Sequence, residues 1–187
     1  MITLVCLLEE RSAEAMLAGI FKRLLPDHVS PIIIPFEGKQ DLEKQLEKKI
    51  RNWQKPDSVF LIMRDKDAGD CVTVKARLLE KVKNAGKQDC SLIRIACHEL
   101  ESFYLGDLQA VENGLNLSGI SHKQNDRKYS NPDRLANAKE EFNRLTRMKY
   151  QQIAGSRAIA PHLSLDGRNC SHSFNVLISG IKRLIDT

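Results

Sequence analysis

Several features that would mark a redox, membrane or ATP-hydrolysing protein are missing from this sequence. The five cysteines are odd in number and contain no Cys-x-x-Cys pair, which argues against a disulfide framework and a zinc site. No apolar run approaches the roughly 20 residues that span a bilayer, and no basic segment precedes the apolar start, so we expect a cytoplasmic protein without membrane contact. Aromatic residues make up only 5%, too few for base-stacking platforms to dominate nucleic-acid binding. A GxxxxGK[ST] motif is also lacking, so any ATP dependence must come from a partner protein.

The composition is that of an ordinary globular protein with an uneven charge distribution. The 187 residues are 42% hydrophobic and 28% charged, enough for one domain or for one domain with a helical appendage. The net charge is +5, and residues 120–187 carry 12 Lys and Arg against 6 Asp and Glu, which leaves 17 against 18 for residues 1–119. This asymmetry favours a polyanionic partner, although a solvated helical face would also produce it.

The most informative stretch is residues 59–70. Five apolar residues with a β-branched and aromatic bias predict a strand buried on both faces, and Asp65 and Asp67 follow where that strand ends. In open α/β sheets this end of a strand is where ligands bind, and the two carboxylates could face one hard cation. The alternative is that Asp and Gly only form the turn out of the strand.

Acidic residues follow two further predicted strands. Residues 2–8 lead to Glu9 and Glu10, and residues 91–97 lead through His98 to Glu99 and Glu101. A fourth short strand is predicted over residues 30–36. Helices are predicted between the strands: one with Ser12 as N-cap that stops near Pro26, one over residues 39–53, and one that contains the apolar stripe Val74, Leu78, Leu79 and Val82 and ends at Gly86. The alternation predicts right-handed βαβ units and a parallel sheet of about four strands, with all three acidic turns along one edge.

After Asp107 the sequence predicts helices only. Asp107 is expected to cap a helix over residues 108–115, and further helices are predicted from Asn131 to about Met148, over 150–160, and from an N-cap at Ser171 to the end. We therefore expect an α/β catalytic domain over residues 1–110 and an all-helical extension over 111–187.

The candidate site residues share one chemistry. Glu9, the Asp65 and Asp67 pair, and Glu99 or Glu101 offer only hard oxygen ligands, which suit Mg²⁺ or Mn²⁺. Two such ions about 4 Å apart can activate a water and stabilise the leaving oxygen in phosphodiester cleavage. A basic residue beside them, Lys149 or Arg147, would stabilise charge on the phosphate, although a solvent-exposed helix end would explain both residues.

Three motifs resemble those of small stand-alone bacterial Toprim-like proteins, which are similar to the Toprim nuclease domain of the overcoming-lysogenization-defect (OLD) family. They are LLEERS at residues 7–12, MRDKD at 63–67 and HELESF at 98–103, with a weaker likeness at KY, residues 149–150, and SHSF, residues 171–174. The resemblance implies a Toprim-like parallel sheet and metal-dependent cleavage of DNA or RNA. It also implies a role in defence against phage or plasmids beside an AAA-type ATPase, and it leaves the oligomeric state open.

The resemblance also assigns roles to single residues. Glu9 would be a metal ligand and acid or base, Asp65 and Asp67 would bind metal, and Glu99 or Glu101 would add a further carboxylate. The family pattern has Glu-Gly where this chain has Glu9 and Glu10, so either glutamate could be the ligand. The acidic residue of the following helix is Glu14, one position later than in the family, and it joins the candidate metal ligands.

Two other functions compete with this interpretation. A haloacid-dehalogenase-like phosphatase also uses an Asp-x-Asp pair, but there the pair follows the first core strand, and here it follows the third predicted strand. A Toprim-shaped module that regulates an ATPase without catalysis would bind neither Mg²⁺ nor Mn²⁺ and would tolerate replacement of Asp65 and Asp67.

Overall fold

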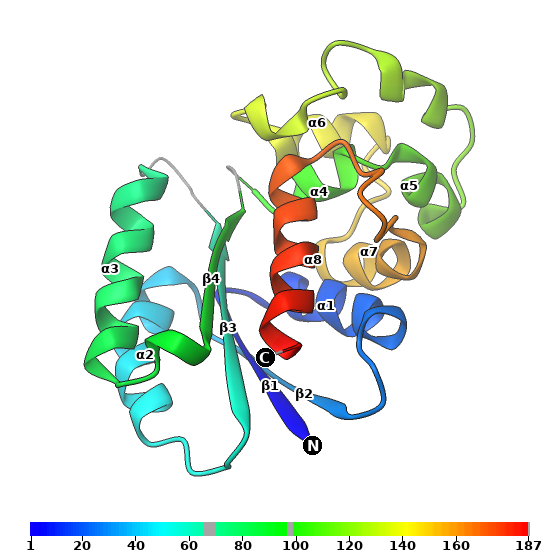
Figure 1. The fold of residues 1–187 in the computed structure, drawn as a ribbon. Coiled ribbons are helices and arrows are strands. Elements are labelled where there is room, and N and C mark those ends of the chain that lie inside the picture. The colour runs from blue at the N-terminus through cyan, green and yellow to red at the C-terminus, as the bar shows by residue number, and fades with distance from the viewer. Residues whose placement is uncertain (66–69, 97–98, 187) are drawn as a thin grey trace.

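The structure is a computed structural model, and it describes residues 1–65, 70–96 and 99–186. Four parallel strands form a single sheet with the order β2-β1-β3-β4 (Figure 1). The strands are β1 (Ile2–Leu8), β2 (Val29–Pro35), β3 (Ser58–Asp65) and β4 (Ser91–Ala96). The predicted α/β class with a parallel sheet of four strands is therefore confirmed.

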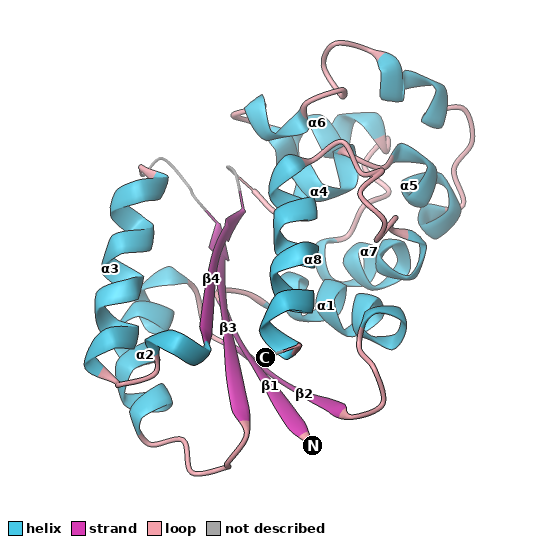
Figure 2. Cartoon of the chain, in the orientation of Figure 1, coloured by secondary structure: helices cyan, strands magenta, loops and turns pink. Residues whose placement is uncertain are grey.

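Helices cover both faces of the sheet, because each apolar strand must be buried on both sides (Figure 2). Helices α2 and α3 lie on one face, and α1 and the C-terminal helix α8 lie on the other. Alternate residues of β1 enter the two cores: Leu4, Cys6 and Leu8 pack under α1, whereas Val5 and Leu7 pack under α2 and α3. The bounds are α1 (Arg11–Leu24), α2 (Lys39–Arg51), α3 (Cys71–Asn84) and α8 (His172–Ile185).

Between β4 and α8 the described chain forms short helices only. They are α4 (Glu101–Leu105), α5 (Leu108–Leu115), α6 (Ala138–Leu145) and α7 (Gln152–Ile159). The same described segment contains three 3-10 turns, which are η2 (Ser121–Asn125), η3 (Pro132–Arg134) and η4 (Ala160–His162). A further 3-10 turn, η1 (Gln88–Cys90), lies before β4. None of the helices in the described ranges is both long enough and apolar enough to cross a membrane.

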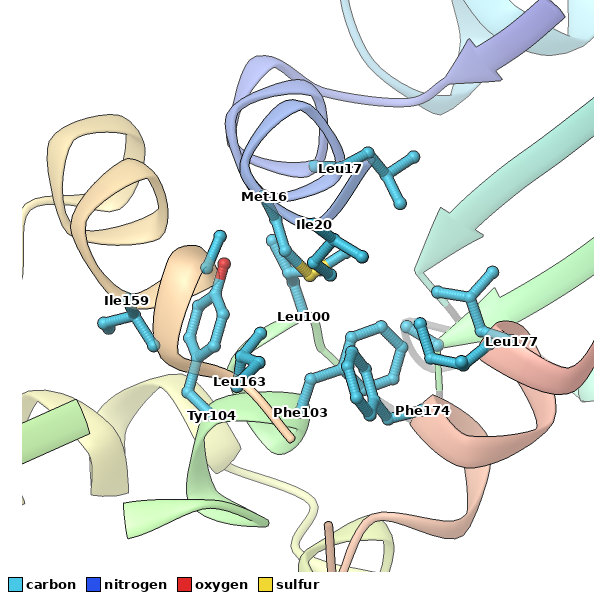
Figure 3. Close-up of a cluster of buried hydrophobic side chains, with 14 of the residues drawn as sticks. Met16, Leu17, Ile20, Leu100, Phe103, Tyr104, Ile159, Leu163, Phe174 and Leu177 are labelled. Atoms are coloured by element: carbon cyan, nitrogen blue, oxygen red, sulfur yellow. The ribbon is translucent and has the colours of Figure 1, made fainter. Parts of the chain in front are cut away.

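One large hydrophobic core joins α1, the short helices and α8. Figure 3 shows its centre, where Met16 and Ile20 of α1 lie near Phe103 and Tyr104 of α4. The ring centroids of Phe103 and Phe174 are 5.3 Å apart, which ties α4 to α8. This core contains side chains from both sides of the predicted domain boundary at residue 110, and the boundary itself stays a prediction.

Two predicted helix starts are wrong. Helix α1 begins at Arg11, and Ser12 lies inside it, where its buried hydroxyl donates to the Glu10 carboxylate. The predicted helix from Asn131 to Met148 is instead a 3-10 turn at Pro132–Arg134, followed by α6. The reason is tertiary: the carboxylate of Asp133 accepts hydrogen bonds from the Ser173 amide (2.7 Å) and the Ser171 hydroxyl (2.6 Å), at the start of α8.

Candidate functional site

The first predicted site residue, Glu9, lies at the carboxyl edge of the sheet between β1 and β3. Its amide donates to the Met63 carbonyl (3.1 Å), so the chain still runs beside β3 after β1 has ended. Its Oε2 accepts a hydrogen bond from the Asp65 amide (3.0 Å) and lies 3.7 Å from Arg64 Nε. These contacts fix the Glu9 carboxylate beside the end of β3.

Asp65 is the centre of a group of carboxylates. Loss of hydration raises its pKa well above the usual value, and the negative charges of Glu10, Glu9 and Glu101 raise it further, against a hydrogen bond from the Leu100 amide. Glu9, Glu10, Asp65 and Glu101 are called the carboxylate cluster below. Its members come from three chain segments that the sheet order brings to one edge, as the sequence predicts.

Glu10 links this edge to the helical part of the chain. It is the N-cap residue of α1 with an extended backbone, and its carboxylate accepts hydrogen bonds from Ser12 and from Gln152 Nε2 (3.4 Å). Gln152 is the first residue of α7. Glu10 is therefore held from both the α/β part and the helical part of the protein.

Glu101 is the most deeply buried member, with only 1% of the residue exposed. It is the first residue of α4, and its Oε1 accepts a hydrogen bond from the Tyr150 hydroxyl (3.1 Å). The Tyr104 hydroxyl donates to Ser156 (2.7 Å), which lies 3.3 Å from the Tyr150 hydroxyl. Burial is the main cause that raises the pKa of Glu101, and Glu10 adds to it.

Other candidate residues have different surroundings. Glu99 Oε2 accepts a hydrogen bond from the Lys139 amide (2.6 Å), so this carboxylate caps the first turn of α6. Glu14 lines a cavity between α1 and α7 together with Arg11 and Arg157. Asp67, like His98, lies outside the described residues. The metal-binding roles of Glu14, Glu99 and Asp67 stay predictions.

Asp107 has the capping role that the sequence predicts. Its Oδ1 accepts a hydrogen bond from the Ala110 amide (3.1 Å) in the first turn of α5. Its Oδ2 accepts a second one from the Ser164 amide (2.8 Å). This carboxylate therefore joins α5 to the loop after η4.

Lys149 and Arg147 are exposed and line a cavity of about 460 Å³ in the helical part. The described residues that line this cavity include none of the carboxylate cluster. Lys149 nevertheless directly precedes Tyr150, whose hydroxyl contacts Glu101. The predicted role of Lys149 beside metal ions stays a prediction.

Sequence reasoning assigned no role to three residues that organise the cluster. Arg64 is only 4% exposed, and its guanidinium pairs with Glu9 and with Glu43 of α2. A single charged residue at the end of an apolar strand was the available signal for it. Tyr150 contacts Glu101, and Tyr104 is linked to Tyr150 through Ser156. No local pattern marks such contacts between distant segments.

The cluster fits a divalent metal by its donor chemistry. Carboxylate oxygens are the ligands that Mg²⁺ and Mn²⁺ prefer, and an ionised carboxylate has about four acceptor positions, so one hydrogen bond leaves room for a cation. Within residues 1–65, 70–96 and 99–186, no three His, Cys, Asp or Glu side chains are already arranged to hold one ion. The described carboxylates are instead held by hydrogen bonds from protein groups.

Comparisons with known proteins give a family. No curated protein and no solved structure matches the chain. A family model described as "Domain of unknown function (DUF4276)" matches residues 8–182, which is nearly the whole chain. The protein belongs to the DUF4276 family.

Proposed function

We propose that this protein is a divalent-metal-dependent nuclease that hydrolyses phosphodiester bonds of DNA or RNA. The observation that carries the proposal is the meeting of carboxylates at the carboxyl edge of the sheet: the Asp65 amide donates to Glu9 Oε2 (3.0 Å), and Glu10, Glu9 and Glu101 add to the effect of burial in raising the pKa of Asp65. Carboxylates that are gathered in one place repel one another, and such clusters are typical of functional sites. A bound cation would remove that repulsion.

The residues that would hold the metal are Glu9, Glu10, Asp65 and Glu101. Bound Mg²⁺ or Mn²⁺ would supply activation of a water and stabilisation of charge on the phosphate. Around this site, Arg64 orients Glu9, Tyr150 holds Glu101, and Gln152 holds Glu10. Residues that are fixed in this way keep their oxygens in place for a ligand.

A nucleic-acid substrate is supported by the charge distribution. The twofold excess of basic over acidic residues after residue 119 lies in the same chain segment as Tyr150 and Gln152, which contact the cluster. A polyanion attracted to that segment would come close to the carboxylates. An AAA-type ATPase partner and a role in anti-phage or anti-plasmid defence belong to this proposal through the resemblance to Toprim-like proteins.

The test is cleavage of plasmid DNA, linear DNA and tRNA by purified protein with Mg²⁺ or Mn²⁺. Asp65→Asn keeps the shape of the side chain and removes the charge. Loss of a group that only supports a metal ligand typically costs about 10- to 100-fold, so we expect this variant to lower the rate by at least about tenfold. Asp89→Asn removes an exposed carboxylate just before β4 and serves as the matched control. EDTA should abolish cleavage by the wild type.

Calorimetric titration of Mn²⁺ distinguishes the non-catalytic alternative. The nuclease proposal expects Mn²⁺ binding by the wild type and by Asp89→Asn, and much weaker binding by Asp65→Asn. A wild type that binds neither ion and cleaves no substrate would instead be a regulatory module. Equal cleavage by the wild type and Asp65→Asn would indicate a contaminating nuclease and would overturn the proposal.

A further inference from the structure

The cavity of about 460 Å³ that contains Lys149 is the strongest candidate for a second binding site. Its volume lies within the roughly 300–1,000 Å³ that is typical of ligand pockets. Four basic residues, Lys123, Arg144, Arg147 and Lys149, line it, against one acidic residue, Glu141. This cavity is called the basic cavity below.

The single acidic residue of the basic cavity is already matched. Glu141 is 4% exposed, and its carboxylate accepts hydrogen bonds from Lys128, from Arg144 Nη2 (2.6 and 2.9 Å) and from the Tyr129 hydroxyl (2.6 Å). In contrast, none of Lys123, Arg147 and Lys149 forms an ion pair with any residue that the structure describes. Three positive charges therefore line one hollow without an ion-pair partner in the described part of the chain.

A tight turn after α6 places two of these cations. Arg147 and Met148 have positive φ values of 52° and 61°, a conformation that is uncommon for residues other than glycine. The turn is fixed by hydrogen bonds from the Met148 amide to the Asn143 carbonyl (2.8 Å) and from the Lys149 amide to the Thr146 carbonyl (3.0 Å). Thr146 is fully buried, so the turn that carries Arg147 and Lys149 is anchored in the core.

We propose that the basic cavity binds a phosphate group of a nucleic-acid strand and anchors the strand beside the carboxylate cluster. Unpaired cations at a concave site are the arrangement that phosphate oxygens require. One stretch of chain carries residues of both sites, because Lys149 lines the cavity and the next residue, Tyr150, contacts Glu101. The claim that the phosphate belongs to a nucleic-acid strand rests on the proposed nuclease function. The claim that the cavity binds phosphate rests on the residues of the cavity alone.

Binding without metal tests this proposal separately from cleavage. Fluorescence anisotropy of a labelled 20-nucleotide duplex in EDTA would compare the wild type with Lys123→Gln/Lys149→Gln. We expect the affinity of the double variant to fall about tenfold or more, and the slope of log K against log salt to fall by about 2. Arg147→Asn, a residue that tolerates positive φ, should weaken binding on its own if the double variant does not fold.

The matched control is Lys48→Gln/Lys83→Gln, which removes the same charge from exposed positions on α2 and α3. The control should change the affinity for DNA less than twofold. If both double variants lose the same affinity, net charge alone explains the loss, and the proposal of a phosphate site in the basic cavity is overturned. Binding is measured in EDTA and without cleavage, so a failed cleavage assay leaves this result independent. If AMP or inorganic phosphate displaces the duplex at comparable phosphate concentration, the site takes small phosphates and the strand is excluded.

Discussion

Among the described residues, a buried arginine lies beside the carboxylate cluster and a buried glutamate lines the basic cavity. Arg64 is 4% exposed and lies among acidic residues, whereas Glu141 is 4% exposed and lies among basic ones. The remaining charges differ in burial. The carboxylates of Asp65 and Glu101 lose hydration, but Arg147 and Lys149 remain exposed.

This difference shows where charge costs stability. Exposed cations repel one another little because water screens them, so a basic cavity can be maintained at little cost. Buried carboxylates cost stability unless cations match them, and Arg64 pairs with Glu9 of the cluster and with Glu43 outside it. The cluster should therefore respond to charge changes more strongly than the cavity does.

The largest effect is expected for Arg64→Met. It leaves Glu9 and Glu43 without their buried cation, so the free energy of unfolding should fall by about 3–5 kcal/mol, as measured for broken buried ion pairs. Urea denaturation followed by circular dichroism measures this change.

Arg77→Met provides the control, because Arg77 also pairs with Glu43 (3.3 Å) but has 51% of its side chain exposed. We expect a loss below about 1 kcal/mol for this surface pair. If Arg64→Met and Arg77→Met lowered the free energy of unfolding equally, burial of the cation would not determine its contribution to stability. The contrast between buried and exposed charges would then be wrong.

A smaller loss is expected in the basic cavity for Glu141→Gln. The amide keeps the shape of the side chain but loses the charge that Lys128 and Arg144 bind, so stability should fall by about 1–3 kcal/mol at neutral pH. The exposed neighbour Glu140→Gln is the matched control and should change stability by less than about 0.5 kcal/mol.

The pH dependence of Glu141 has a defined sign. Burial alone would raise its pKa, but the hydrogen bonds from Lys128, Tyr129 and Arg144 outweigh it and hold the pKa below the usual value. A lowered pKa in the folded state adds stability above the usual carboxyl pKa, and that stability is lost as the pH falls through the folded value. The wild type and Glu141→Gln should therefore converge in acid, and a constant gap down to pH 2 would contradict this cause.

The sheet and the edge that carries the cluster could be predicted because both depend on local patterns. Apolar runs of strand length alternate with helical periodicity, and parallel strands place their carboxyl ends together, so Glu9 and Asp65 meet although they are 56 positions apart. The choice between Glu99 and Glu101 could not be made, since it depends on α4 and α6. Glu99 caps α6, whereas Glu101 turns towards Tyr150.

The helical part was predicted less well because its elements are short and defined by long-range contacts. The α6 start depends on Glu99, and the turn before it depends on Asp133 binding the start of α8. Arg64 carried only a weak signal, and Glu141 carried none, since acidic residues in the first turn of a helix are ordinary. Local sequence thus identifies the acidic donors but not the side chains that hold them.

The smallest expected effect has the opposite sign and concerns Asp65→Asn without metal. The pKa of Asp65 is raised by burial and then by Glu10, Glu9 and Glu101, so its ionised form opposes folding at neutral pH. The stability of the wild type should fall as the pH rises from about 3.9, the usual pKa of an aspartate, through the higher pKa that Asp65 has in the folded protein. Removing the charge should therefore stabilise the protein by more than the roughly 0.5 kcal/mol typical of surface changes.

Thermal unfolding in EDTA from pH 4 to pH 8 measures this effect, with Asp89→Asn as a control that should match the wild type at every pH. The difference in stability between Asp65→Asn and the wild type should grow with pH. Only in the wild type can the side chain at position 65 ionise beside Glu9, Glu10 and Glu101. Added Mn²⁺ should then stabilise the wild type more than Asp65→Asn, since a cation relieves the repulsion that the variant lacks. If the variant is less stable than the wild type in EDTA, the carboxylate serves as a structural hydrogen-bond acceptor for the Leu100 amide, and electrostatic strain no longer supports a metal site at this edge.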